Sequence, residues 1–167
     1  IARLGGYVVT PALNGQIGLI AVNDGGGSPA TAPWGSVEAF MSTNPLAAGI
    51  PWKDGQPIVV DVSTSVVALG KLYMKEAAGE PAPPGWIIGE DGETTTDVDA
   101  VLGEPQRGAV MPLGGMEAGH KGFGLSLLID ILCGALSGTG CSTGKAWDIN
   151  LNGIFALAID PGRFAIG

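Results

Sequence analysis

Residues 119–136 read GHKGFGLSLLIDILCGAL, and from residue 123 onward this stretch is apolar at almost every position. Residues 123–136 therefore predict a helix that is apolar on nearly every side and lies buried at the centre of the fold. Gly138 and Gly140 are expected to end this helix. The run contains Asp130 and is too short to span a bilayer, so we expect a core helix and no membrane-spanning segment.

His120 and Lys121 directly precede this helix, and His120 is the only histidine in the chain. The first N–H groups of a helix lack partners within the helix and carry partial positive charge. A histidine and a lysine at that point predict a binding site for an anion. Flanking Gly119 and Gly122 would let a ligand approach the backbone closely. A capping histidine with an exposed lysine explains the same residues equally well.

Short apolar runs predict the strands of the fold, at residues 17–22, 58–60 and 154–159. Thr64 and Ser65 are predicted to cap a second helix over residues 66–78. Residues 111–122 are turn-rich and give little helix signal. The mixture predicts an α/β or α+β fold. The chain starts without methionine and ends just after an apolar strand, so we expect residues 1–167 to form a single, partial domain of a longer protein.

The charge balance argues against two classes of partner. Lys and Arg total 8 against 16 Asp and Glu, giving a net charge of −8. Nucleic acid and anionic membranes reward clustered positive charge, so we expect neither as a partner. Only 14% of residues are charged and 46% are hydrophobic, which predicts surface buried against further chain or in an oligomer.

The cysteines and the N-terminal composition predict a cytoplasmic chain. Cys133 and Cys141 match no zinc spacing and form no disulfide framework, so we expect one buried thiol on a helix and one loop thiol. No basic segment precedes an apolar run, as it would in a signal peptide. No cluster of metal-ligating residues is present, and we expect no metal.

Two further segments carry polar groups at turns. Asp61 ends a β-branched run and precedes Thr64, an arrangement that suits a sugar hydroxyl or a carboxamide, or ordinary helix capping. Thr43 lies in an Asn-Pro turn that can orient a carboxylate or be a plain turn. Lys71 lies in the following helix, where a solvated lysine is the usual outcome. No G-x-G-x-x-G motif follows a strand, so a Rossmann site is unsupported.

In combination these segments resemble the type-2 malate/L-lactate dehydrogenase family, which includes ureidoglycolate, sulfolactate and piperideine-2-carboxylate oxidoreductases. The matching motifs follow one another in order over essentially the whole chain. They are Pro33-Trp34-Gly35, Ser42-Thr43-Asn44-Pro45-Leu46-Ala47, Val60-Asp61-Val62-Ser63-Thr64-Ser65, Gly70-Lys71, Pro112-Leu113-Gly114-Gly115, Gly119-His120-Lys121-Gly122-Phe123-Gly124-Leu125 and Ala158-Ile159-Asp160-Pro161.

The resemblance implies a non-Rossmann fold that binds NAD or NADP, a homodimer, and hydride transfer between the cofactor and C2 of a 2-hydroxy or 2-oxo acid. It implies cofactor contacts at Asp61, Val62, Ser63, His120 and Lys121. It implies substrate contacts at Thr43, Leu69 and Gly70. Lys71 stands where some members carry an acid that assists the proton relay, so the resemblance implies a catalytic role for it.

The chain departs from the family pattern in ways that affect its expected activity. Ser42, Ser36 and Ser63 replace small residues that are usual at those positions. In the family an Asn-x-x-His segment precedes the stretch that matches residues 1–7, so the expected acid/base histidine would directly precede Ile1. General acid–base help is worth roughly 10²–10⁴-fold, and we expect these residues alone to be nearly inactive. The alternatives are a non-catalytic module that binds a nucleotide or another anion, and a structural domain without a ligand.

Overall fold

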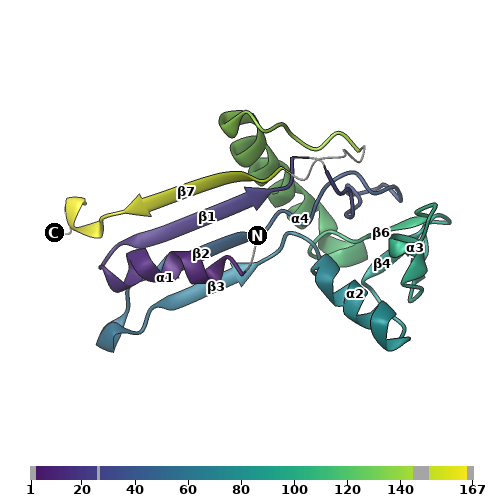
Figure 1. Cartoon of the computed structure of the whole chain (residues 1–167), viewed down its shortest axis with the longest axis horizontal. Coiled ribbons are helices and arrows are strands. Elements are labelled where there is room, and N and C mark those ends of the chain that lie inside the picture. Colours follow the sequence, from purple (N-terminus) through teal and green to yellow (C-terminus); the bar gives the residue numbers. More distant parts are fainter. Residues whose placement is uncertain (1–2, 26, 145–150, 165–167) are drawn as a thin grey trace.

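The computed structural model describes residues 3–25, 27–144 and 151–164. A long four-stranded sheet forms one end of the molecule and a smaller sheet forms the other, with helix α4 between them (Figure 1). The long sheet has the strand order β3-β2-β1-β7, and every neighbouring pair is antiparallel. Its strands are β1 (Ile17–Asn23), β2 (Leu46–Ile50), β3 (Ile58–Val62) and β7 (Gly153–Ile159). The three predicted strands are confirmed as β1, β3 and β7.

The smaller sheet has the order β5-β4-β6 and is also antiparallel. Its strands are β4 (Ile87–Gly89), β5 (Thr94–Thr95) and β6 (Gly108–Val110). Helices α2 (Leu69–Ala78) and α3 (Asp99–Leu102) share a hydrophobic core with it, built around Leu72, Ile87 and Val110. A Rossmann fold is built on parallel strands, so these antiparallel sheets confirm the mixed, non-Rossmann architecture.

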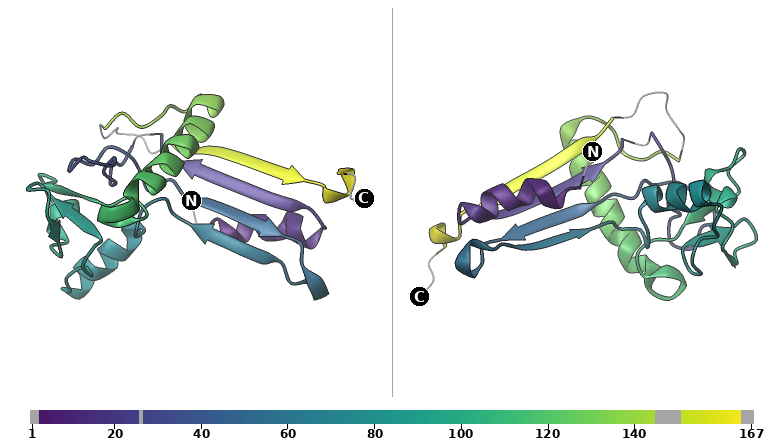
Figure 2. Two further views of the ribbon diagram at one scale, coloured as in Figure 1. Left: turned by 180° about the vertical axis from the view of Figure 1, so that it is seen from behind. Right: turned by 60° about the horizontal axis from the view of Figure 1, so that its bottom comes forward.

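Helix α1 (Gly5–Leu13) lies across one face of the long sheet, as the right-hand view of Figure 2 shows. Two glycines and an internal proline make this segment a poor helix former, and its sequence gives no helix signal. Packing stabilises it instead: Val8 is buried against Ile20 and Val22 of β1. Gly49 of β2 makes the close contact possible, because a Cβ at that position would overlap the backbone of Val8.

Helix α4 (Gly115–Asp130) begins at Gly115 and continues as a short π-helix, η2 (Ile131–Ala135). The turn prediction is therefore confirmed for residues 111–114 but wrong for residues 115–122, where the helix has already begun. The glycines of this segment serve packing. A Cβ on Gly119 would lie 2.8 Å from the Trp34 ring, and one on Gly122 would overlap the backbone of Leu113. Small residues here let α4 lie directly on the preceding loops.

The expectation that this helix is buried all round was also wrong. One side is buried, through Ser126, Ile129 and Cys133, whereas Leu128 is 53% exposed on the other side. Asp130 is buried, and its carboxylate accepts hydrogen bonds from Asn23 Nδ2 (3.0 Å) and from the backbone N–H of Ser142 (2.8 Å). These bonds explain how an acid is accommodated inside an apolar run.

The face of the long sheet opposite α1 is apolar and largely uncovered. The strand register places Leu19, Ala48, Val60 and Leu157 in one row across this face. Helix α4 covers only one end of it, where Ile129 packs near Leu46 and Phe155. The left-hand view of Figure 2 shows α4 crossing that end and leaving the rest of the face open. Ile58, Val60 and Val62 are 43–45% exposed there.

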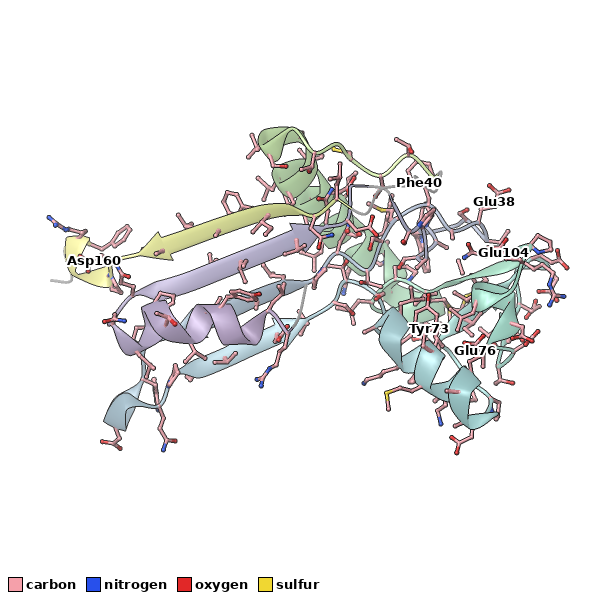
Figure 3. All side chains as sticks on the ribbon, in the orientation of Figure 1. Glu38, Phe40, Tyr73, Glu76, Glu104 and Asp160 are labelled. Atoms are coloured by element: carbon pink, nitrogen blue, oxygen red, sulfur yellow. The ribbon has the colours of Figure 1, made fainter. Side chains whose placement is uncertain are left out.

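The remaining surface features concern charge and thiols. Figure 3 shows Glu38 and Glu104 at the end with the smaller sheet and Asp160 at the far end of the long sheet, so acidic residues are spread over the molecule. Cys133 is buried and Cys141 is partly exposed in a loop, and both are free thiols, as predicted. No described helix combines the length and the apolar character needed to cross a membrane. Within the described ranges, no three His, Cys, Asp or Glu side chains are grouped to hold a metal ion.

Candidate functional site

A groove beside the end of strand β3 gathers five of the predicted site residues: Thr43, Asp61, Val62, Ser63 and Lys71. We call it the β3 groove. Its other lining residues are Arg3, Leu4, Pro45, Val59, Val66, Val67 and Ala68, and its volume is about 790 Å³. The five residues come from the turn before β2, the end of β3 and the first turn of α2. Ligand sites commonly have volumes of roughly 300–1,000 Å³, so the groove is large enough for a small acid and part of a cofactor.

Asp61 contributes a carboxylate that is held by the backbone of α1. Its Oδ2 accepts a hydrogen bond of 2.8 Å from the N–H of Gly5 and lies 3.6 Å from Arg3 Nε. Asp61 therefore binds the first turn of α1 and not the first turn of α2, which the capping alternative had anticipated. No described donor occupies its Oδ1, and the side chain is 24% exposed. One carboxylate oxygen is thus available to a hydroxyl or amide of a ligand.

The hydroxyl residues after Asp61 stabilise a loop and do not cap a helix. Ser63 Oγ donates to the carbonyl of Ser65 (2.9 Å), and Ser65 Oγ donates to the carbonyl of Val67 (2.7 Å). Thr64 Oγ1 lies within hydrogen-bonding distance of the carbonyls of Thr43 and Asn44. The predicted capping of a helix over residues 66–78 was therefore wrong, because α2 begins only at Leu69 and has no side-chain cap.

Thr43 and Lys71 bring uncommitted polar groups to the groove. The hydroxyl of Thr43 makes no hydrogen bond to any residue that the structure describes, and Lys71 is exposed and makes no ion pair with a described residue. A hydroxyl and an ammonium group in one groove are able to bind the carboxylate and the C2 oxygen of a small acid.

Leu69 and Gly70, the other predicted substrate contacts, open helix α2 but do not line the groove. Leu69 packs against the core that contains Val67 and Leu72. Gly70 is exposed, and a Cβ placed on it would meet nothing within 4 Å.

His120 and Lys121 lie outside the β3 groove, in the second turn of α4. Because α4 begins at Gly115, the inference that they stand beside unpartnered N–H groups at a helix start was wrong. The His120 ring packs edge-on against Trp34, with 5.8 Å between ring centroids. Trp34 also lines a separate, mainly apolar pocket of about 360 Å³ with Met111 and Met116. The structure thus divides the predicted cofactor contacts between two places.

Arg3 and Asn44 belong to the site region although neither was predicted as a site residue. Arg3 reaches the groove only because α1 packs on the sheet, and no local pattern announces that packing. Asn44 is completely buried, and its amide donates to Ser126 on α4. Its place between a threonine and a proline indicates a turn but gives no sign of this distant contact.

Comparison with known proteins identifies the family to which the chain belongs. The family model described as malate/L-lactate dehydrogenase matches residues 1–166. The chain is 43% identical over 137 residues to a malate dehydrogenase of Pyrococcus horikoshii, covering 80% of this chain and 36% of that protein. It is 34% identical over 159 residues to a (2R)-3-sulfolactate dehydrogenase (NADP(+)) of Chromohalobacter salexigens, covering 90% and 44%.

A solved structure agrees with these sequence matches. The Δ1-piperideine-2-carboxylate reductase of Pseudomonas syringae superposes with a TM-score of 0.83 at 31% identity, covering 97% of this chain and 48% of that one. The chain therefore spans less than half the length of each of these three relatives. Because the family model matches almost every residue and the fold matches as well, the chain belongs to the malate/L-lactate dehydrogenase family.

Proposed function

We propose that the chain forms the cofactor-binding part of an oxidoreductase that transfers a hydride between NAD or NADP and C2 of a 2-hydroxy or 2-oxo acid. The observation that carries the proposal is the β3 groove, in which residues from three separate segments meet. Family membership supports the reaction class, because the relatives are named for malate, sulfolactate and a cyclic imino acid.

The side chains of the groove fit both ligands of this reaction. The open oxygen of Asp61 and the backbone of Val62 and Ser63 suit the hydroxyl and carboxamide groups of a nicotinamide nucleoside. When bound, the nicotinamide ring gives or accepts the hydride. Thr43 orients the carboxylate of the acid through its free hydroxyl. Lys71 donates a hydrogen bond to the C2 oxygen, and its positive charge stabilises negative charge that develops there.

His120 and Lys121 have a different role in this proposal. They lie on α4 outside the groove, so they contact the nucleotide part of the same cofactor at a distance from the reacting ring. Lys121 supplies the positive charge that a phosphate requires. The pocket beside Trp34 lies next to His120 and is apolar enough to accept a planar base. The name of the Chromohalobacter relative favours NADP over NAD as the first cofactor to test.

We further propose that these 167 residues are nearly inactive by themselves. Relatives are more than twice as long as the parts that match this chain. The described groove contains carboxylate, hydroxyl and ammonium groups but no histidine. A missing general acid or base costs roughly 10²–10⁴-fold in rate, so the full-length polypeptide is the material to assay.

The test follows oxidation of NADH and NADPH at 340 nm by the full-length polypeptide, with oxaloacetate, pyruvate and glyoxylate as acceptors. Lys71→Met is expected to lower kcat/KM by about 10²-fold if the ammonium acts at C2. Lys75→Met is the matched control, because Lys75 lies one turn further along α2 and pairs with Glu80 (2.6 Å) outside the groove. Turnover with none of the acids would refute the proposed reaction. Binding of NADPH without turnover would favour a non-catalytic nucleotide-binding module.

The surface of the chain supports a homodimer as the working form. A folded monomer of this mass is expected to expose about 7,600 Å², whereas the chain exposes 9378 Å². A stable interface covers about 800 Å² on each partner, so the excess is enough for one interface in addition to contacts with the rest of the full-length polypeptide. Sedimentation of the full-length polypeptide at the mass of one copy would refute this.

The free thiols Cys133 and Cys141 support a reducing compartment such as the cytoplasm.

A further inference from the structure

A buried set of hydrogen bonds joins the parts of the site, and the proposed reaction makes no direct use of it. Thr64 lies at its centre. The backbone N–H and Oγ1 of Thr64 both donate to the carbonyl of Thr43, at 3.1 Å each. The same hydroxyl lies 3.0 Å from the carbonyl of Asn44, so its single proton is shared between two carbonyls of one turn. Thr64 thereby fastens the turn that carries Thr43 to the segment that follows Asp61.

Two routes extend this connection to helix α4. Asn44 Nδ2 donates to Oγ and to the backbone carbonyl of Ser126, at 3.0 and 3.2 Å. The carbonyl of Thr64 accepts from the N–H of Leu113 at 2.9 Å, and the carbonyl of Leu113 accepts from the N–H of Gly122 at 3.2 Å. Thr64 is therefore the point at which the turn, the end of β3 and the helix that carries His120 and Lys121 are held together.

Burial makes these bonds specific. Asn44, Thr64 and Ser126 are 0, 3 and 1% exposed, so water does not replace a lost partner easily. Asn44 also adopts an unfavourable conformation: its φ is 32°, and its buried Oδ1 has no partner among the described residues. Backbone strain of this kind concentrates at functional sites, where surrounding contacts hold it in place. The buried hydrogen bonds of Asn44 and Thr64 therefore hold the turn in one geometry.

We propose that Thr64 is a positioning residue, whose hydroxyl sets the placement of Thr43 relative to residues 61–63. This rests on the proposed function, in which Thr43 contacts the acid and residues 61–63 contact the cofactor. The acid contacts Thr43 and, through its C2 oxygen, Lys71 on α2, whereas the cofactor contacts residues 61–63, so every contact is retained when the connection loosens. The loosening disturbs the distance between C2 of the acid and the hydride, which determines the rate of the chemical step.

The test compares Thr64→Val, which removes the hydroxyl at nearly constant shape, with Thr64→Ser, which retains it. Assays use the full-length polypeptide at 25 °C. Misplacement of a reacting group by about 1 Å costs about 10²-fold, so Thr64→Val is expected to lower kcat by about 10–100-fold. KM for the acid and Kd for the cofactor are expected to stay within about threefold, and Thr64→Ser is expected to restore kcat to within about threefold.

Thr31→Val is the matched control, because Thr31 is equally buried, at 2% exposure, and its Oγ1 has no partner among the described residues. It is expected to leave kcat unchanged. If Thr64→Val does not fold, Ser126→Ala takes its place; it removes one of the two acceptors of Asn44 and is expected to lower kcat by a smaller factor.

Three results would overturn the inference. The first is a lower Tm with normal kcat, and the second is a loss confined to KM or to Kd. The third is equal loss in Thr64→Val and Thr64→Ser. A wild-type polypeptide that turns over no acid would instead refute the proposed function, and the positioning role would fall with it.

Discussion

Replacing Gly122 with alanine is expected to lower the free energy of unfolding by about 1–2 kcal/mol. The added Cβ would lie 2.5 Å from the backbone nitrogen of Leu113 and 2.8 Å from its Cα. Backbone atoms cannot rotate away, so α4 must move from the loop that precedes it. Overpacking costs about 1–3 kcal/mol, and contacts this short with fixed backbone atoms place it at about 2–3 kcal/mol. The better helix propensity of alanine returns about 1 kcal/mol.

Gly124 provides a matched comparison in the same helix. It is exposed, and a Cβ there meets nothing within 4 Å. Gly124→Ala is therefore expected to raise the free energy of unfolding by about 0.5–1 kcal/mol through helix propensity alone. The two substitutions are chemically identical and lie two positions apart, so the sign of the difference reports packing against Leu113.

Urea unfolding followed by circular dichroism at 222 nm measures both variants. The midpoint is expected to fall for Gly122→Ala and to rise for Gly124→Ala, with the slope m unchanged. A Gly122→Ala variant as stable as the wild type would show that α4 does not lie against Leu113 as described.

Three further predictions concern stability and pH. Thr31→Val removes a buried hydroxyl that has no described partner, so Tm is expected to stay level or rise, and a fall would contradict the unpaired state. Asp61→Ala removes the acceptor for the N–H of Gly5 and is expected to lower the free energy of unfolding by about 0.5–2 kcal/mol in urea. Asp61→Asn keeps an acceptor oxygen and is expected to retain most of the wild-type stability. Burial, with a smaller contribution from the charge of Asp130, raises the pKa of the Cys133 thiol. The protonated thiol therefore contributes its full stability below the ordinary thiol pKa of about 8.5, and this contribution is lost as the pH rises through the folded-state pKa. Over this pH range the urea midpoint of the wild type is expected to fall more than that of Cys133→Ala.

Much of the candidate site could be predicted from the sequence. The motifs that follow the family order include Thr43, Asp61, Ser63 and Lys71, and the fold brings these four residues into one groove. The strands β1, β3 and β7 could be predicted because apolar and β-branched runs specify them locally. Where the local pattern and the tertiary contacts agree, sequence reasoning is enough.

The rest depends on contacts that a local pattern does not carry. Glycine marks a turn in one setting and a close helix contact in another, so Gly119 and Gly122 read as turn residues although they lie within α4. Helix α1 has poor intrinsic propensity and is stabilised by the sheet beneath it, where Gly49 leaves room. His120 lies away from the groove because α4 begins at Gly115, and the sequence does not reveal this early start because the glycines of α4 read as turn residues.

The pairing of β1 with β7 also affects how the chain folds during synthesis. Asn23 pairs with Gly153, 130 residues later in the sequence. At a synthesis rate of about 5–20 residues per second, the edge of β1 that pairs with β7 stays unpaired for roughly 7–26 s, until β7 has been made. During that interval an apolar strand edge is open to other chains, which is the condition under which β-rich proteins aggregate. Coexpression with chaperones is therefore expected to improve the yield of folded protein.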